Sequence, residues 1–241
     1  MLAVNGHPDR TCQRSQPELG FETTRQLARL GYRVVLAARD LNKAEIAAEI
    51  LRGEQLDVVP HHLDVASAES CARLSQLDVD VLVNNAAVMA ESDENPFSAG
   101  VLSRSALNVA PDLLREAFET NTLGAYRVMQ ALATGMRDRG YGRIVNVSSG
   151  LGQLNEMLGG YPAYRVSKVG LNALTRIFAS ELREAGVLVN SVCPGWAKTD
   201  MGGSQAQLEP EEAVATIVWA ATFPDDGPTG GFFRSKQPIP W

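Results

Sequence analysis

Short apolar runs alternate with segments of helical periodicity along most of this sequence. Apolar runs predict buried strands at 32–38, 56–63, 79–83, 143–147 and 188–193. Apolar residues at helical spacing predict helices at 22–30, 42–51, 67–74, 111–137, 162–185 and 210–221. Short strands are also predicted over 1–4 and 231–233, so the alternation extends from the first residues to the last.

Some of the predicted strands are apolar at successive positions, as at 34–36 and 81–83. Continuous runs of that kind are typical of parallel sheets that are covered by helices on both faces. The pattern therefore predicts a doubly wound, Rossmann-type α/β fold, and the absence of a break in composition predicts one domain over 1–241. In such sheets ligands bind beyond the carboxyl ends of the strands.

The composition favours a soluble enzyme. The formal charge of −6 and the pI near 5.2 argue against a nucleic-acid or anionic-membrane surface. No apolar run approaches the ~20 residues of a membrane helix, and the first residues lack the pattern of a signal peptide. We therefore expect a cytoplasmic protein that acts on a small molecule. The three Cys and three His residues lack the spacing of a disulfide framework or a metal site, so no metal is expected.

Tyr164 and Lys168 are the first candidate catalytic pair. They lie four residues apart in the predicted helix 162–185, so both side chains are expected on one face. A phenol has a free pKa of about 10, and a neighbouring ammonium favours the phenolate. This spacing also occurs by chance on solvated helices, so the interpretation depends on the rest of the sequence.

Polar residues and small motifs follow the predicted strands in an ordered series. They are Arg39, Asp64, Asn84-Asn85-Ala86, Ser148-Ser149 and Pro194-Gly195. Together with Tyr161-Pro-Ala-Tyr-Arg-Val-Ser-Lys168 and Cys193-Pro-Gly-Trp-Ala-Lys-Thr-Asp-Met201, they make the chain from Leu19 onward resemble the short-chain dehydrogenase/reductase family. The residues within these motifs are most similar to those of the NADPH-dependent carbonyl reductases.

The resemblance implies a role for each of four catalytic residues. Tyr164 corresponds to the general acid, and Lys168 corresponds to the lysine that tunes the tyrosine and holds the nicotinamide ribose. Ser149 corresponds to the residue that hydrogen-bonds the substrate oxygen, and Asn121 to the one that supports a proton relay. The alternatives are that Ser149 merely closes a strand and that Asn121 is an exposed helix residue.

The resemblance also implies the cofactor and the substrate class. Arg39 favours NADPH, because an arginine at the end of the second strand pairs with the 2′-phosphate; the alternative is a solvated arginine beside Asp40. The implied cofactor-binding residues are Gly6, Leu19, Gly20, Arg39, Asp64, Val65, Asn85, Ala86, Tyr164, Lys168, Pro194, Gly195 and Thr199. The implied substrate wall is Leu151, Leu154, Met157, Tyr161, Trp196 and Met201. This wall predicts a hydrophobic ketone, aldehyde or alcohol as the substrate, unless some of its members are core residues.

Many members of the family assemble as dimers or tetramers. The resemblance therefore implies a homo-oligomer, a dimer or tetramer, built through helices 111–137 and 162–185.

The chain departs from the family in its phosphate-binding turn, which the family writes TGxxxGxG. Without a gap, the turn would end at Gly20 and place Glu18 beside two phosphates. A second alignment pairs Gly6 and Gly20 with the outer glycines, fourteen positions apart instead of six, and we prefer it because it keeps the strand 1–4. Ala87 also stands where the family has glycine.

Three interpretations of these departures remain open. In the first, the turn is an elongated variant that holds NADPH weakly. In the second, the protein has lost the cofactor and performs non-redox acid/base chemistry as an isomerase, lyase or cyclase. In the third, the first twenty residues come from a shifted reading frame or a redesign. A non-catalytic subunit on the same fold is a further alternative.

Overall fold

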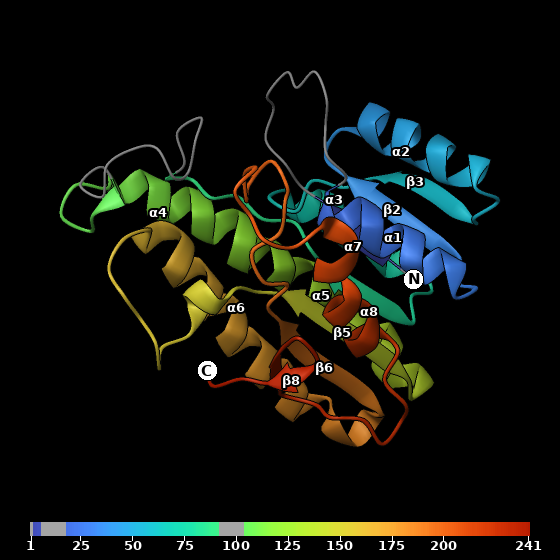
Figure 1. The fold of residues 1–241 in the computed structure, drawn as a ribbon. Helices are drawn as coiled ribbons and strands as arrows, with labels where there is room; N and C mark the ends of the chain where they lie inside the picture. Colours follow the sequence, from blue (N-terminus) through green and yellow to red (C-terminus); the bar gives the residue numbers. More distant parts are fainter. Residues whose placement is uncertain (1, 6–17, 92–103) are drawn as a thin grey trace.

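The computed structural model describes residues 2–5, 18–91 and 104–241, and these form one eight-stranded sheet (Figure 1). The strand order is β3-β2-β1-β4-β5-β6-β7-β8. All neighbours are parallel except β7 and β8, which are antiparallel. The strands are β1 (Leu2–Asn5), β2 (Val34–Ala38), β3 (Val58–His62), β4 (Val81–Asn84), β5 (Gly142–Val147), β6 (Val187–Val192), β7 (Phe232–Arg234) and β8 (Gln237–Pro238).

Helices follow the strands as the alternation predicts. They are α1 (Leu19–Arg29), α2 (Leu41–Gly53), α3 (Ala68–Ala72), α4 (Pro111–Phe118), α5 (Ala125–Arg139), α6 (Pro162–Glu181), α7 (Pro210–Ala213) and α8 (Ala215–Ala221). Three 3₁₀ turns, η1 (Arg73–Gln76), η4 (Gly150–Gly152) and η5 (Arg183–Ala185), and the π-helix η3 (Glu119–Gly124) complete the described elements.

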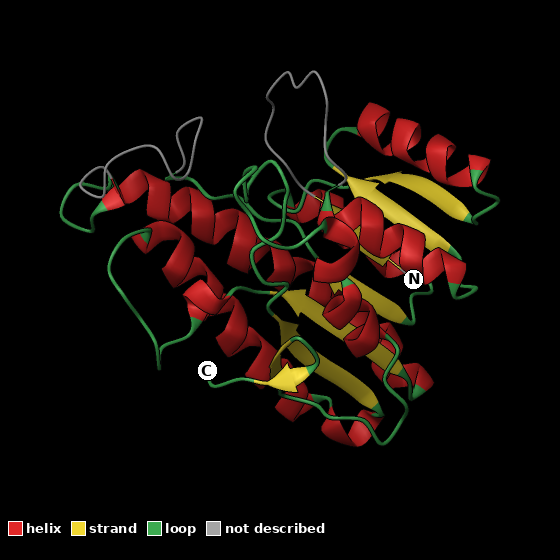
Figure 2. Cartoon of the chain, viewed as in Figure 1, coloured by secondary structure: helices red, strands yellow, loops and turns green. Residues whose placement is uncertain are grey.

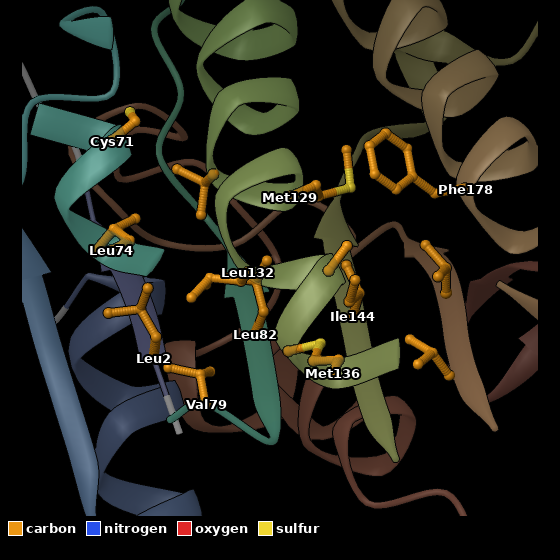
Figure 3. Packing of buried hydrophobic residues seen from close by; sticks show 14 of the residues in the cluster. Leu2, Cys71, Leu74, Val79, Leu82, Met129, Leu132, Met136, Ile144 and Phe178 are labelled. Atoms are coloured by element: carbon orange, nitrogen blue, oxygen red, sulfur yellow. The ribbon is translucent and has the colours of Figure 1, made fainter. Parts of the chain in front are cut away.

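The helices cover both faces of the sheet (Figure 2). On β4, Leu82 packs into one apolar cluster, and its neighbours Val81 and Val83 pack into the other. The first cluster joins the sheet to α3, α5 and α6, and Figure 3 shows Leu132 of α5 and Phe178 of α6 within it. The second cluster joins it to α1, α2 and α8. The doubly wound fold expected from the sequence is confirmed.

The long helix predicted over 111–137 is wrong as a single α-helix. It is α4, then the π-helix η3, then α5. Two side chains of η3 reach into the protein: Asn121 bonds the main chain of Val88, and the Thr122 hydroxyl donates to the Ser167 carbonyl at 2.8 Å. These contacts are with residues distant in the sequence, so helical periodicity cannot reveal the wider turn.

Two smaller differences lie near the C-terminus. The predicted helix 210–221 divides into α7 and α8, and the final hairpin adds β8, which the sequence did not predict. The predicted first strand is present as β1, whereas Gly6 lies outside the described residues.

None of the helices in the described ranges combines the length and hydropathy that crossing a membrane requires.

Candidate active site

A cavity of about 710 Å³ lies at the carboxyl ends of the central strands. Its wall is built from the N-terminus of α1, the segments that follow β4, β5 and β6, helix α6 and the end of β7. Eleven sequence-predicted site residues line it: Leu19, Asn85, Ser149, Leu151, Tyr164, Lys168, Pro194, Gly195, Trp196, Thr199 and Met201. The topology therefore brings together residues that are far apart in the chain.

Helix α6 positions the candidate catalytic pair. The helix begins with Pro162, and Tyr164 and Lys168 lie one turn apart on its buried face. The Lys168 ammonium lies 5.6 Å from the centre of the Tyr164 ring and donates a hydrogen bond of 2.8 Å to the Val147 carbonyl of β5. The four-residue spacing thus places both groups in one site.

Burial dominates the electrostatics of this pair. Burial raises the pKa of Tyr164, although its hydrogen bond with Ser149 lowers it, and the neighbouring Cys193 and Glu91 raise it further. Burial lowers the pKa of Lys168 to about 8, and Cys193 acts in the opposite direction. The direction for Tyr164 is the reverse of the one expected from its spacing to Lys168, because desolvation of the phenolate is the largest contribution.

The two serines after β5 have different surroundings. The Ser149 hydroxyl is hydrogen-bonded to Tyr164 and also accepts from the Leu151 N–H at 3.1 Å. It therefore both closes the strand and faces the candidate acid/base residue. The Ser148 hydroxyl is buried at the cavity wall and has no hydrogen-bond partner among the described residues. A polar group of a bound ligand would satisfy it.

Asn121 is buried rather than exposed, so the interpretation as a surface helix residue is wrong. Its amide donates to the Val88 carbonyl at 2.8 Å and to the Ser167 hydroxyl at 2.9 Å, and its oxygen accepts from the Val88 N–H at 2.7 Å. Asn121 thus joins the segment after β4 to α6, beside the cavity rather than in its wall.

The apolar wall differs partly from the predicted one. Leu151, Trp196 and Met201 line the cavity as expected. Leu154 and Met157 are exposed outside it, and Tyr161 turns its ring against Arg104 instead. Sequence reasoning missed Met89, Leu158, Leu208 and Arg234, which also line the cavity. Their positions depend on loop geometry, although Leu158 lies within 151–161, the segment in which the sequence had already predicted four wall residues.

The N-terminus of α1 opens toward the same cavity. Leu19 begins the helix, and its N-cap, Glu18, makes no side-chain capping bond. Gly20 is buried in the first turn, where its carbonyl accepts from the Thr24 hydroxyl at 2.8 Å. Helix N–H groups and the helix dipole attract phosphate, whereas the Glu18 carboxylate opposes it.

The residues implied for the adenosine half lie beyond the cavity. Arg39 is exposed after β2, and Asp40 beside it caps α2. The Asp64 side chain accepts from the Ala66 N–H at 3.0 Å, and Val65 is buried against α5. Their arrangement after successive strands matches the predicted order.

The loops implied for the nicotinamide end have distinct backbone requirements. Gly195 has a φ of 82°, and a Cβ there would meet Leu208 at 2.6 Å, so glycine is needed. Thr199 accepts from the Gly202 N–H at 3.0 Å and holds the loop after β6. Ala86 is half-buried beside Ala87, whose φ is not positive, so the turn accommodates the alanine that replaces the family's glycine.

Comparisons with known proteins agree with this geometry. Residues 17–210 match the family described as short chain dehydrogenase. The chain is 32% identical to carbonyl reductase [NADPH] 1 of Sus scrofa, covering 92% of this chain and 90% of that protein, and 31% identical to (+)-neomenthol dehydrogenase of Capsicum annuum, covering 91% and 93%. The solved structure of salutaridine reductase from Papaver somniferum superposes with a TM-score of 0.75 at 27% identity, covering 97% and 99%.

The chain belongs to the short chain dehydrogenase family and is a Rossmann-type oxidoreductase. In the described part of the chain, no group of three or more Cys, His, Asp or Glu side chains is arranged to hold a metal.

The contact between Gly152 and α6 gives a testable prediction. A Cβ at Gly152 would lie 2.8 Å from the Lys168 Cβ and 3.0 Å from its main-chain carbon. Gly152→Ala should therefore displace Lys168 and lower kcat by roughly tenfold, because sub-ångström misplacement of catalytic groups is costly. Gly159→Ala is the matched control, since a Cβ there meets nothing within 4 Å. Equal kcat for the two variants, measured by steady-state kinetics, would contradict the prediction.

Proposed function

We propose that this protein is an NADPH-dependent carbonyl reductase that reduces a ketone or aldehyde of a hydrophobic small molecule and oxidises the matching alcohol in reverse. The observation that carries the proposal is the hydrogen-bonded pair of Ser149 and Tyr164, with Lys168 buried beside it, in one cavity. The printed name of the Sus scrofa relative, a carbonyl reductase that uses NADPH, supports it.

The residues present fit this cofactor. The α1 N-terminus opens to the cavity, the buried Ser148 hydroxyl lacks a partner there among the described residues, and Arg39 is exposed where the 2′-phosphate would lie. The residues proposed to hold it are Leu19, Gly20, Arg39, Asp64, Val65, Asn85, Ala86, Lys168, Pro194, Gly195 and Thr199. Bound NADPH supplies the hydride.

The protein's own groups supply the proton and the orientation. The Tyr164 phenol donates its proton to the carbonyl oxygen as that oxygen gains negative charge, and the Ser149 hydroxyl donates a hydrogen bond to the same oxygen. Because burial raises the pKa of Tyr164, the phenol is protonated at neutral pH, as reduction requires. Lys168 holds positive charge beside the phenol, and we propose that Asn121 supports the relay that returns a proton to it.

The cavity wall supports a hydrophobic substrate. Leu151, Trp196 and Met201 line it, together with Met89 and Leu158. Apolar walls with a few convergent polar groups are typical of small-molecule sites. Non-redox chemistry and a non-catalytic role are not favoured, because the relatives reported above are reductases or dehydrogenases by name.

Replacement of the phenol tests the acid/base assignment. Tyr164→Phe should lower kcat for carbonyl reduction by at least about 100-fold, the lower range for loss of a general acid. Its NADPH dissociation constant, measured by fluorescence titration, should change little because the ring remains. Wild-type kcat in this variant would exclude Tyr164 as the acid.

Arg39 tests the cofactor preference. Arg39→Ala should raise the NADPH dissociation constant roughly tenfold, the effect expected for loss of a hydrogen bond to a charged group, and leave that of NADH unchanged. Arg33→Ala removes an exposed arginine just before β2 and is the control. A similar change for both cofactors would argue against recognition of the 2′-phosphate.

We also propose a homo-oligomer, a dimer or tetramer, through α4 and α6. Phe118, Val166 and Ile177 expose apolar side chains on these two packed helices. Light scattering of the pure protein should give two or four times the mass of 26.0 kDa. A monomer at micromolar concentration would contradict this assembly.

Two broader expectations remain proposals. A single domain over residues 1–241 is supported by one continuous sheet across the described residues. A cytoplasmic location is supported by the free, buried thiols Cys71 and Cys193, which suit a reducing compartment.

A further inference from the structure

Glu91 is a buried carboxylate that the catalytic assignment does not use. It lies after β4, at the end of the segment whose earlier residues Asn85, Ala87 and Met89 line the cavity. Both carboxylate oxygens accept hydrogen bonds from the first turn of α6. The Ala163 N–H donates to Oε1, and the Tyr164 N–H donates to Oε1 at 3.1 Å and to Oε2 at 3.3 Å.

The first turn of α6 depends on this carboxylate for its hydrogen bonds. Pro162 has no N–H, and the Arg165 N–H donates to the Tyr161 carbonyl at 2.9 Å. The N-cap residue, Tyr161, has left-handed backbone angles and provides no side-chain cap. The Ala163 and Tyr164 N–H groups remain, and both donate to Glu91. Because these residues are buried, solvent would not readily replace the carboxylate.

A second contact joins the same two segments. Asn121 bonds both main-chain groups of Val88 and donates to the Ser167 hydroxyl of α6, which in turn donates to the Tyr164 carbonyl at 2.7 Å. The segment 85–91 is therefore fixed to α6 near both the N–H and the C=O of Tyr164. Its position sets the cavity wall and the catalytic helix together.

We propose that Glu91 is a positioning residue for the acid/base tyrosine: its carboxylate fixes the first turn of α6 and, through it, the Tyr164 phenol relative to Ser149 and the wall formed by Asn85 and Ala87. This inference rests on the proposed function, because it assigns Glu91 to the same reaction.

The charge of Glu91 adds a measurable signature. The titratable and charged groups around the phenol are Lys168 on the same helix, Cys193 after β6 and Glu91 after β4. Negative charge at Glu91 raises the pKa of Tyr164. Removing that charge lowers this pKa, so the loss of the protonated acid at high pH begins at lower pH in the reduction direction. In the oxidation direction, where the phenolate is the base, the rise in rate also begins at lower pH.

Two substitutions at one position separate geometry from charge. Glu91→Gln keeps an amide oxygen that can accept from both N–H groups but removes the charge, whereas Glu91→Ala removes both. Glu49→Gln neutralises an exposed glutamate of α2 and is the control. For each protein, kcat and KM are measured across pH with NADPH and a ketone, and amide hydrogen exchange is followed at Ala163 and Tyr164.

The expected pattern differs among the variants. Glu91→Ala should lower kcat about tenfold or more, with KM changed less than about twofold, and speed exchange at both amides. Glu91→Gln should keep kcat within about threefold and protect both amides. The basic limb of its pH profile, which is the fall in kcat for reduction at high pH, should move to lower pH. Glu49→Gln should match the wild type.

Several results would overturn the inference. They are wild-type kcat and exchange in Glu91→Ala, or an equal loss in both Glu91 variants without a shift of the basic limb. If Glu91→Ala does not fold, Glu91→Gln decides: faster exchange at Ala163 and Tyr164 with a wild-type kcat refutes the inference, whereas exchange and kcat that change together support it. If the wild type neither binds nor oxidises NADPH, the proposed function fails, and the exchange at Ala163 and Tyr164 still decides whether Glu91 holds the helix.

Discussion

The packing of α6 against the end of β5 is the constraint on which the site depends. Gly152 lies so close to Lys168 that even a methyl group would collide with the helix. The ammonium can then reach the Val147 carbonyl, and the phenol can reach Ser149. The same close packing removes water from both groups, which raises the pKa of Tyr164 and lowers that of Lys168 to about 8. Position and proton affinity therefore have one physical cause.

The sequence predicts the parts of this arrangement that are local. The apolar runs identify the central strands, and the spacing of Tyr164 and Lys168 is enough to place both on one helix face. The π-helix at Asn121 and the carboxylate of Glu91 escape prediction, because each depends on contacts between segments far apart in the chain. The direction of the Tyr164 pKa escapes for the same reason, since desolvation is known only once the helix is packed. Tyr161 was predicted in the substrate wall, but its ring lies against the Arg104 guanidinium instead, which is also a contact between distant segments.

The two halves of the proposed cofactor site differ in how closely they follow the family pattern. At the nicotinamide end, the turn accommodates Ala87, and Gly195 keeps the conformation that its loop requires. At the phosphate end, α1 begins beside the cavity as the fold requires, but Glu18 brings a carboxylate to the same place. Gly6, the other glycine expected there, lies outside the described residues. We therefore expect the phosphate end to limit cofactor affinity and the α6 site to determine the chemistry.

Transfer of a labelled hydride tests the central claim most directly. The protein is mixed with a hydrophobic ketone and with NADPH that carries deuterium on one face of C4, and each face is labelled in turn. The product is examined by mass spectrometry and NMR. The account predicts that one of the two labelled cofactors gives an alcohol with deuterium on the former carbonyl carbon and that the other does not. An alcohol without deuterium from either cofactor, or conversion of the ketone that proceeds without NADPH, would contradict it.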